Sequence, residues 1–316
     1  MNEFITNFFG SVAEPSSETW AGVLLGALGF VLGFALNRGS ICTVVATTEL
    51  VLEKRPARFI ALFEAAVWAA LVYAILRASP AMEQGWLPLA YLVPAALLFG
   101  VGSYVNGACV LGSVGHFGNG QFDFGFAFLG IAAVLYLESA FGLIPDQPPI
   151  RASVPLGTVL LTATLLVIIA LRLGFSFRSE SNFRQLTISM AAIGITFTVL
   201  SILAPGFSIT TSLGPIAIPI AGAIILVCMF AGSFASARLR EHRVVVKWPT
   251  IGDILRRAAG GIVMGVGAVL IPGGNDTILM IGFPMGAWEA ALAYALFVAS
   301  MAVLIARCGS LAKSWS

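Results

Sequence analysis

The chain has 316 residues, of which 59% are hydrophobic and only 10% are charged, and its mean hydropathy is +0.97. So few charged side chains cannot cover the surface of a water-soluble domain, so the composition excludes a soluble protein and indicates one that lies in a lipid bilayer. The formal net charge of +2 is uninformative by itself, and we expect no nucleic-acid partner. Four cysteines without a Cys-x-x-Cys pair and two distant histidines predict neither a disulfide framework nor a metal site, and no cofactor is expected.

Nine apolar runs are long enough to cross a bilayer, which takes roughly 17–25 residues in a helix. In chain order they cover residues 20–36, 59–76, 88–104, 124–141, 154–171, 186–203, 215–234, 254–271 and 286–306. The sequence therefore predicts an all-α integral membrane protein. It forms a single membrane domain over residues 1–316 with about nine transmembrane helices.

The basic residues predict how these helices are oriented, because cytoplasmic loops carry an excess of Lys and Arg. With nine crossings and the N-terminus outside, all of the 17 Lys and Arg residues except Arg77 and Arg151 fall in cytoplasmic segments. Residues 1–18 contain three acidic residues and no basic one, so they do not resemble a signal peptide. We therefore expect an external N-terminus and a cytoplasmic C-terminus.

Glycine-rich segments interrupt two of the apolar runs in a similar way. Residues 100–112 and residues 265–276 each contain a Gly-x-Gly step that leads into a helix-breaking cluster. Helices broken at corresponding places in two halves point to a substrate site near the membrane midplane. We predict short broken or re-entrant helices at both places, and two pseudo-symmetric halves over residues 19–172 and 185–308. The alternative is that the glycines serve only close helix packing.

Cys109 stands at the expected start of a short helix, directly after Gly107 and Ala108. Unpaired backbone N–H groups and the positive end of the helix dipole attract an anion there, and Asn106 adds an amide donor. A thiol is a weak and polarizable donor that suits a large sulfur anion. The alternative is that Cys109 is only a small apolar residue packed in a membrane helix.

Cys42 lies in a third glycine-containing segment, four positions after Arg38. Its neighbours include hydroxyl residues such as Ser40 and Thr43, which would line a hydrated vestibule. Arg38 is better explained as an anchor at the cytoplasmic face than as an anion ligand.

In the second half, Gly273, Gly274 and Asn275 present flexible backbone N–H groups and an amide. We expect these three residues to form the wall of the central site opposite Cys109. Asp276 follows them, and we interpret it as the cap of the next short helix. Proton or cation coupling through Asp276 is the alternative.

Five other residues are explained more simply by packing or by their position in the chain than by a role in the substrate site. Cys228, in the middle of an apolar run, is expected to pack, and Cys308, near the C-terminal boundary, is expected to be incidental. His116 is expected in a solvated loop after the Cys109 segment. Glu64 and Glu138 fall within apolar runs, where an ionisable group is costly, but both lie near an end of their run.

The first two cysteines lie in the motifs Asn37-Arg38-Gly39-x-x-Cys42 and Gly107-Ala108-Cys109-x-x-Gly112. With the paired Gly-x-Gly helices, these motifs resemble those of the YeeE/YedE family of bacterial sulfur transporters, and the resemblance spans most of the chain. It implies an inner-membrane importer of thiosulfate with two pseudo-symmetric halves, in which short helices meet at the middle and cysteines contact the ion in relay. A third family cysteine should fall where this chain has Gly274 and Asn275, which departs from a relay of three thiols.

The sequence therefore predicts a permease, not an enzyme, for thiosulfate or a related sulfur-containing anion. Two alternatives stay open. A membrane thiol oxidoreductase would favour a close cysteine pair, and Cys42 and Cys109 are distant in the sequence although their proximity in space is not excluded. A channel would deliver sulfur to a cytoplasmic sulfurtransferase as its partner. The chain has no ATP-binding P-loop, so ion gradients, substrate consumption or another protein would drive transport.

Overall fold

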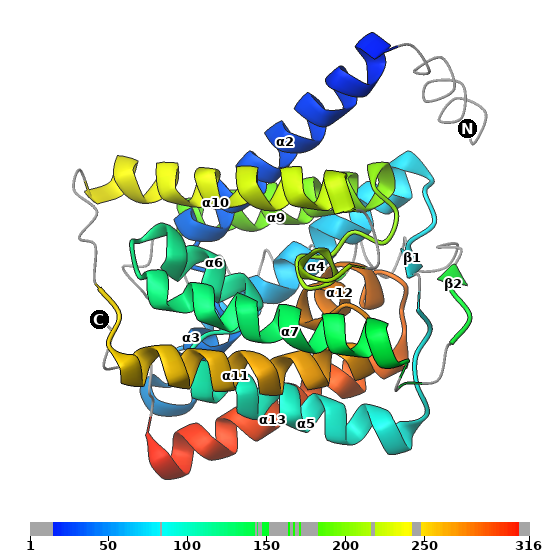
Figure 1. Ribbon diagram of the computed structural model, residues 1–316. Helices are drawn as coiled ribbons and strands as arrows, with labels where there is room; N and C mark the ends of the chain where they lie inside the picture. The colour runs from blue at the N-terminus through cyan, green and yellow to red at the C-terminus, as the bar shows by residue number, and fades with distance from the viewer. Residues whose placement is uncertain are drawn as a thin grey trace.

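The structure is a computed structural model. It describes residues 15–82, 84–142, 144, 147–151, 164, 167, 171, 183–215, 219–241 and 248–309. The long helices in this part of the chain are α2 (Pro15–Arg38), α4 (Ala57–Leu76), α5 (Leu89–Asn106), α7 (Gly125–Phe141), α9 (Phe183–Leu203), α10 (Pro219–Glu241), α11 (Ile251–Leu270) and α13 (Trp288–Cys308). Figure 1 shows them packed together, with the N-terminal part of α2 projecting beyond the other helices.

Within the described residues, seven helices are long and apolar enough to cross a membrane. An eighth span results if α11 is counted together with the short helices after it, to which it is bent by 44°. The predicted all-α membrane fold is confirmed, but a count of nine is not. Each predicted apolar run corresponds to one of these helices except 154–171, which lies outside the described residues apart from 164, 167 and 171.

Short elements connect the long helices. They are α3 (Thr43–Thr48), η1 (Glu49–Glu53), α6 (Val110–Gly118), η2 (Phe122–Phe124), η3 (Thr211–Leu213), α12 (Gly274–Thr277) and η4 (Ile278–Gly282). The strands β1 (Ala81–Met82) and β2 (Ile150–Arg151) form one antiparallel pair, with Ala81 opposite Arg151. Both glycine-rich segments break a helix as predicted: α5 stops before α6, and α11 stops before α12.

Two pairs of long helices pack closely through glycine. Helix α2 packs along α10, and α5 packs along α11. A Cβ atom at Gly33 of α2 would collide with the backbone carbonyl of Met229, and a Cβ atom at Gly232 of α10 would collide with that of Phe30. Small residues let the backbones of membrane helices approach in this way. The segments around Gly33 and Gly232 therefore lie against each other.

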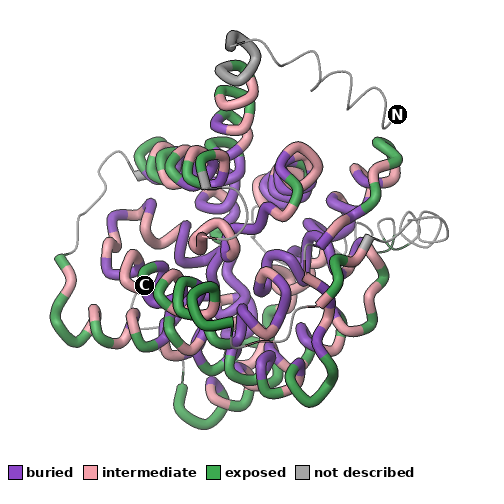
Figure 2. Tube along the Cα trace, turned by 45° about the vertical axis from the view of Figure 1, so that its right-hand side comes forward, coloured by how far each residue is buried: buried purple, intermediate pink, exposed green. Residues whose placement is uncertain are grey.

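The exposed and buried surfaces are arranged as in a membrane protein. In Figure 2 the buried stretches lie in the interior of the bundle and the exposed stretches face outward. Large apolar side chains face outward on several helices: Val227 is 67% exposed, Leu129 64% and Ile188 61%. Apolar side chains on the outside suit lipid rather than water. The protein is thus a multi-pass membrane protein with polar groups in its interior.

Several predicted cytoplasmic segments share one end of the bundle. Helix α10 ends, α11 begins and α13 ends at the left of Figure 1, whereas β1 and β2 lie at the right. This arrangement agrees with the prediction that those segments lie on the same side of the membrane. That this side faces the cytoplasm stays a prediction.

Candidate functional site

The two cysteines of the predicted path face each other. Cys42 directly precedes α3, and Cys109 directly precedes α6. Their Sγ atoms lie 4.0 Å apart, and the Cys109 Sγ accepts a hydrogen bond from the backbone N–H of Thr43 at 3.4 Å. Both are free thiols, with 3% of Cys42 and 0% of Cys109 exposed. The structure thus brings together two candidate residues that 67 positions separate in the sequence.

Two glycines allow this approach. Gly107 has a φ of 80°, in the left-handed region that favours glycine, and it turns the chain between α5 and α6. Gly112 lies in the first turn of α6 and faces Cys42. A Cβ atom at Gly112 would collide with the Cys42 Sγ and would lie 2.7 Å from the Cys42 Cβ. The thiol of Cys42 therefore occupies space that only a glycine at position 112 leaves open.

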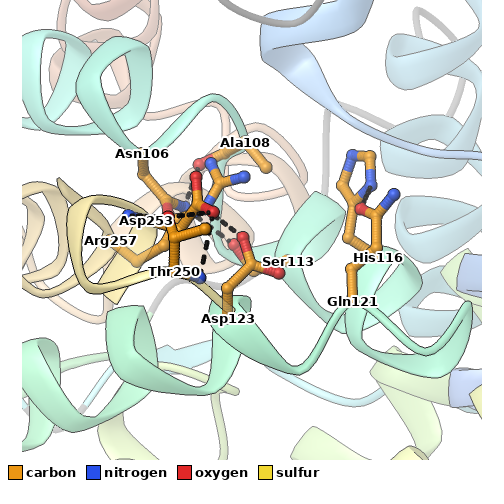
Figure 3. Close-up of polar contacts among 9 residues, drawn as sticks. All are labelled: Asn106, Ala108, Ser113, His116, Gln121, Asp123, Thr250, Asp253 and Arg257. Atoms are coloured by element: carbon orange, nitrogen blue, oxygen red, sulfur yellow. Dashed lines mark hydrogen bonds and ion pairs between the residues drawn. The ribbon is translucent and has the colours of Figure 1, made fainter. Parts of the chain in front are cut away.

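The side chain of Asn106 holds the turn before Cys109 together. Its amide Nδ2 donates to the carbonyl oxygen of Ala108 at 2.7 Å and to Ser113 Oγ at 2.9 Å (Figure 3). An amide carries two hydrogens, so both are used inside this segment. The residues around Gly107 and Ala108 are therefore fixed by their own side-chain contacts.

The segment Gly273, Gly274 and Asn275 lies at the start of α12, and α12 packs against α6. Gly273 and Gly274 have φ values of 72° and 76°. Asn275 is fully buried, and neither its Oδ1 nor its Nδ2 has a hydrogen-bond partner among the described residues. Buried amides are normally bonded, so this one marks a candidate contact for a ligand.

Asp276 does not cap the following helix, and that prediction is wrong. It lies inside α12, whose cap position is Gly273. Its carboxylate is fully buried and accepts hydrogen bonds from the backbone N–H of Ile209 at 2.6 Å and from Thr210 Oγ1 at 3.0 Å. A buried carboxylate needs such donors, and here they come from a loop that is distant in the sequence.

Similar contacts occur beside α6 and within α12. In the first half, the backbone N–H of Thr43 donates to the thiol of Cys109. In the second half, the loop that contains Ile209 and Thr210 donates to Asp276. Sequence reasoning missed this loop. The spacing Gly-x-x-x-Thr, which recurs at residues 39–43 and 206–210, was the signal that could have identified it.

Two cavities approach these residues. One of about 120 Å³ is lined by Cys42, Asn37, Ser40, Arg58, His116 and Asn119, among others. The other, of about 110 Å³, borders β1 and is lined by Gly273, Thr277, Ser208, Thr211, Glu138 and Met82, among others. The first therefore reaches a cysteine of the first half, and the second reaches the glycine segment of the second half.

The structure corrects three further predictions. His116 lies within α6 rather than in a solvated loop, next to Gln121 (Figure 3). Its ring stacks on Phe124 with the centroids 4.5 Å apart. Arg257, predicted in a cytoplasmic loop, is fully buried in α11. Glu64 is also fully buried, well inside α4. Glu138 is half-buried and borders the second cavity.

Arg257 is accommodated because it is paired. Its Nε donates to Asp123 Oδ2 at 2.8 Å, and its guanidinium lies 3.6 Å from the centroid of the Phe124 ring. A buried charge is tolerated only with such a partner. Asp123 is 134 positions away, so hydropathy alone could not place this arginine.

The remaining cysteines lie where they were expected. Cys228 is half-buried in α10, and its Sγ would lie 3.1 Å from a Cβ atom at Gly26 of α2. It therefore packs between these two helices. Cys308 is exposed at the end of α13. In the part of the chain that the structure describes, no group of three or more His, Cys, Asp or Glu residues could hold a metal ion.

Comparison with known families identifies the chain. A family model described as sulphur transport matches residues 38–185 and, a second time, residues 146–303. The first match contains Cys42, Cys109 and both of their short helices, and the second contains the segment from Gly273 to Asn275. No curated protein matches the chain. The two family matches together span most of the sequence, and the protein therefore belongs to the sulphur transport (YeeE/YedE) family.

Proposed function

We propose that this protein is a permease of the bacterial inner membrane that imports thiosulfate or a related sulfur-containing anion. The observation that carries the proposal is the pair of buried thiols, Cys42 and Cys109, with their Sγ atoms 4.0 Å apart between the short helices α3 and α6. Membership of a sulphur transport family supports a sulfur compound as the substrate.

The proposed path connects the two cavities. The anion enters the cavity that borders β1 and passes Gly273, Gly274 and Asn275. It then reaches Cys109 and Cys42 and leaves through the cavity that Cys42 lines. The packing of α12 against α6 supports this route, because it places the two glycine segments next to each other. The same packing and the double family match support two halves over residues 19–172 and 185–308.

The chemistry of the path suits a sulfur anion. The first turn of α6 presents backbone N–H groups and a positive partial charge, which attract an anion to Cys109. The thiols are polarizable and donate only weakly, so they contact sulfur without holding it tightly. Asn106 braces this turn in the proposal rather than contacting the anion, because both of its amide hydrogens are engaged.

We infer that transport runs inward, toward the end at which α10 and α13 end. Cytoplasmic loops carry an excess of Lys and Arg, and the loop after α10 contains several. The N-terminus then lies outside and the C-terminus lies in the cytoplasm. A cytoplasmic sulfurtransferase that consumes the imported sulfur would keep the gradient directed inward.

The same thiol pair favours one second candidate, a membrane thiol oxidoreductase. A disulfide needs an Sγ–Sγ distance of about 2.05 Å, so a shift of about 2 Å would join Cys42 to Cys109. Such an enzyme would cycle between dithiol and disulfide, whereas a permease would work with both thiols reduced.

Uptake of radiolabelled thiosulfate into lipid vesicles that contain the purified protein tests the proposal. We expect uptake well above that of empty vesicles, and little uptake by Cys42→Ala or Cys109→Ala. Cys228→Ala is the matched control, since it removes a thiol from a packing position, and should transport like the wild type. Uptake no faster than in empty vesicles would contradict the proposal. A Cys42–Cys109 disulfide that forms and is reduced again, in protein that takes up no thiosulfate, would favour the oxidoreductase.

A further inference from the structure

A tyrosine and a threonine place two hydroxyl groups beside the thiol pair. Tyr294 comes from α13 and is 2% exposed, and Thr43 is the first residue of α3 and is fully buried. The Tyr294 hydroxyl lies close to the Thr43 side chain and near both thiols, and the backbone N–H of Thr43 itself contacts the Cys109 Sγ. Helices α13 and α3 pack against each other, which brings these groups together.

Neither hydroxyl has a hydrogen-bond partner of ordinary geometry among the described residues. Leaving a buried donor unsatisfied costs about 1–3 kcal/mol, so two such groups side by side need an explanation. Thr47, one turn further along the same face of α3, is also fully buried, and its Oγ1 also lacks a partner among those residues. The interior therefore offers hydroxyl donors next to two thiols.

The position of the Tyr294 hydroxyl is set by packing. Its ring makes edge contacts with Phe63, Phe283 and Phe297, with centroid distances of 5.6, 5.8 and 5.7 Å. Edge-to-face contacts of this kind fix the orientation of an aromatic ring. The hydroxyl is thus a preorganised donor rather than a mobile one.

We propose that the hydroxyls of Tyr294 and Thr43 bind the oxygen atoms of the transported anion while Cys42 and Cys109 contact its sulfur end. This inference rests on the proposed transport function and specifies its substrate class. Hydroxyls make short hydrogen bonds to hard oxygen atoms, whereas thiols suit soft and polarizable sulfur. The site therefore selects an anion with a terminal sulfur at one end and oxygens at the other. Sulfate satisfies only the hydroxyls, and hydrosulfide satisfies only the thiols.

Two conservative variants test this assignment in vesicles that contain the whole protein. Tyr294→Phe removes one oxygen and keeps the ring contacts, and Thr43→Val replaces a hydroxyl by a methyl group of similar size. We expect each to raise the thiosulfate concentration for half-maximal uptake about tenfold, the size of one hydrogen bond to a charged group. Both should weaken inhibition by sulfate and leave inhibition by hydrosulfide unchanged. Thr43→Ser, which keeps the hydroxyl, should behave like the wild type.

Tyr73→Phe is the matched control. Tyr73 is 1% exposed, its hydroxyl also lacks a hydrogen-bond partner among the described residues, and it faces Ser201 rather than the cysteines. We expect Tyr73→Phe to leave the thiosulfate concentration for half-maximal uptake unchanged. Equal effects of Tyr73→Phe and Tyr294→Phe would overturn the inference. The inference would also be overturned if Tyr294→Phe and Thr43→Val left both the thiosulfate concentration for half-maximal uptake and the inhibition by sulfate unchanged. That result would leave the proposed transport function unaffected. A wild-type protein that takes up no thiosulfate would overturn the transport function itself.

Discussion

The Sγ atom of Cys42 lies 4.0 Å from the Sγ atom of Cys109, although 67 positions separate the two residues. Each cysteine ends a glycine-containing turn and directly precedes a short helix. Both cysteines are buried, and we propose that the transported anion passes them. The proposed permease depends on this contact.

The first prediction concerns Gly112, which gives the Cys42 thiol its space. Gly112→Ala would place a methyl group on the Cys42 Sγ and displace it, at a cost of about 1–3 kcal/mol for overpacking. We expect thiosulfate uptake to fall about tenfold or more. Gly115→Ala on the same helix is the control, because its Cβ would lie 3.8 Å from the nearest atom, the Cα of Asn37. Similar uptake by both variants would show that the position of Cys42 is not critical.

The second prediction concerns Gly274, in the wall of the second half. Its φ of 76° is strained for any L side chain, and a Cβ atom would lie 2.9 Å from Thr210 Oγ1. We expect Gly274→Val to abolish uptake in protein that still reaches the membrane, and Gly274→Ala to be milder. Gly286→Ala is the control for backbone strain alone, because Gly286 also has a positive φ but no atom lies within 4 Å of its Cβ position. Normal uptake by Gly274→Val would place the path elsewhere.

The third prediction concerns the ion pair of Arg257 and Asp123. Arg257→Met leaves the Asp123 carboxylate buried without this cation, so we expect a loss of about 3–5 kcal/mol in stability. Thermal unfolding in detergent measures it, and the double variant Asp123→Leu/Arg257→Met should recover part of the loss. Arg58→Met breaks the more exposed pair with Glu49 and should cost about 1 kcal/mol or less. Equal shifts for Arg257→Met and Arg58→Met would refute a buried role for the pair.

The transmembrane helices could be predicted because hydropathy is a local property. Except for 154–171, each apolar run corresponds to a helix that the structure describes. The breaks after α5 and α11 could be predicted for the same reason. Gly107 at positive φ ends α5, and α11 ends at Leu270, two residues before Pro272, which cannot continue a helix. Cys42 and Cys109 could be selected as candidates from their glycine neighbours, but their contact could not be derived from either segment alone.

Residues whose role depends on distant partners were missed or misplaced. Tyr294 looks like any aromatic residue of an apolar helix until α13 is packed against α3. Asp276 resembles a helix cap until the loop with Ile209 supplies its donor. His116 resembles a loop residue beside Gly115 until its ring stacks on Phe124. In all three cases the contact that decides the residue's position comes from another element of the structure, and the sequence around the residue does not contain it.

The fourth prediction concerns topology. A reporter fused to the C-terminus should be found in the cytoplasm, and a reporter inserted in the loop of residues 204–213 should be found outside, because cytoplasmic segments concentrate Lys and Arg. Paired alkaline phosphatase and fluorescent protein fusions report the two sides. Finding both reporters on one side would contradict the proposed orientation.

Protection of the thiols by substrate tests the central claim most directly. Cys228→Ala leaves Cys42, Cys109 and the exposed Cys308 as the thiols to be labelled with N-ethylmaleimide and quantified by peptide mass spectrometry. The exposed Cys308 is the internal control, because slower labelling of Cys308 would show that thiosulfate had consumed the N-ethylmaleimide. If the anion passes between the buried thiols, thiosulfate slows the labelling of Cys42 and Cys109 and leaves Cys308 unchanged, whereas sulfate protects less. Unchanged labelling of Cys42 and Cys109 in vesicles that import thiosulfate would show that the anion takes another route.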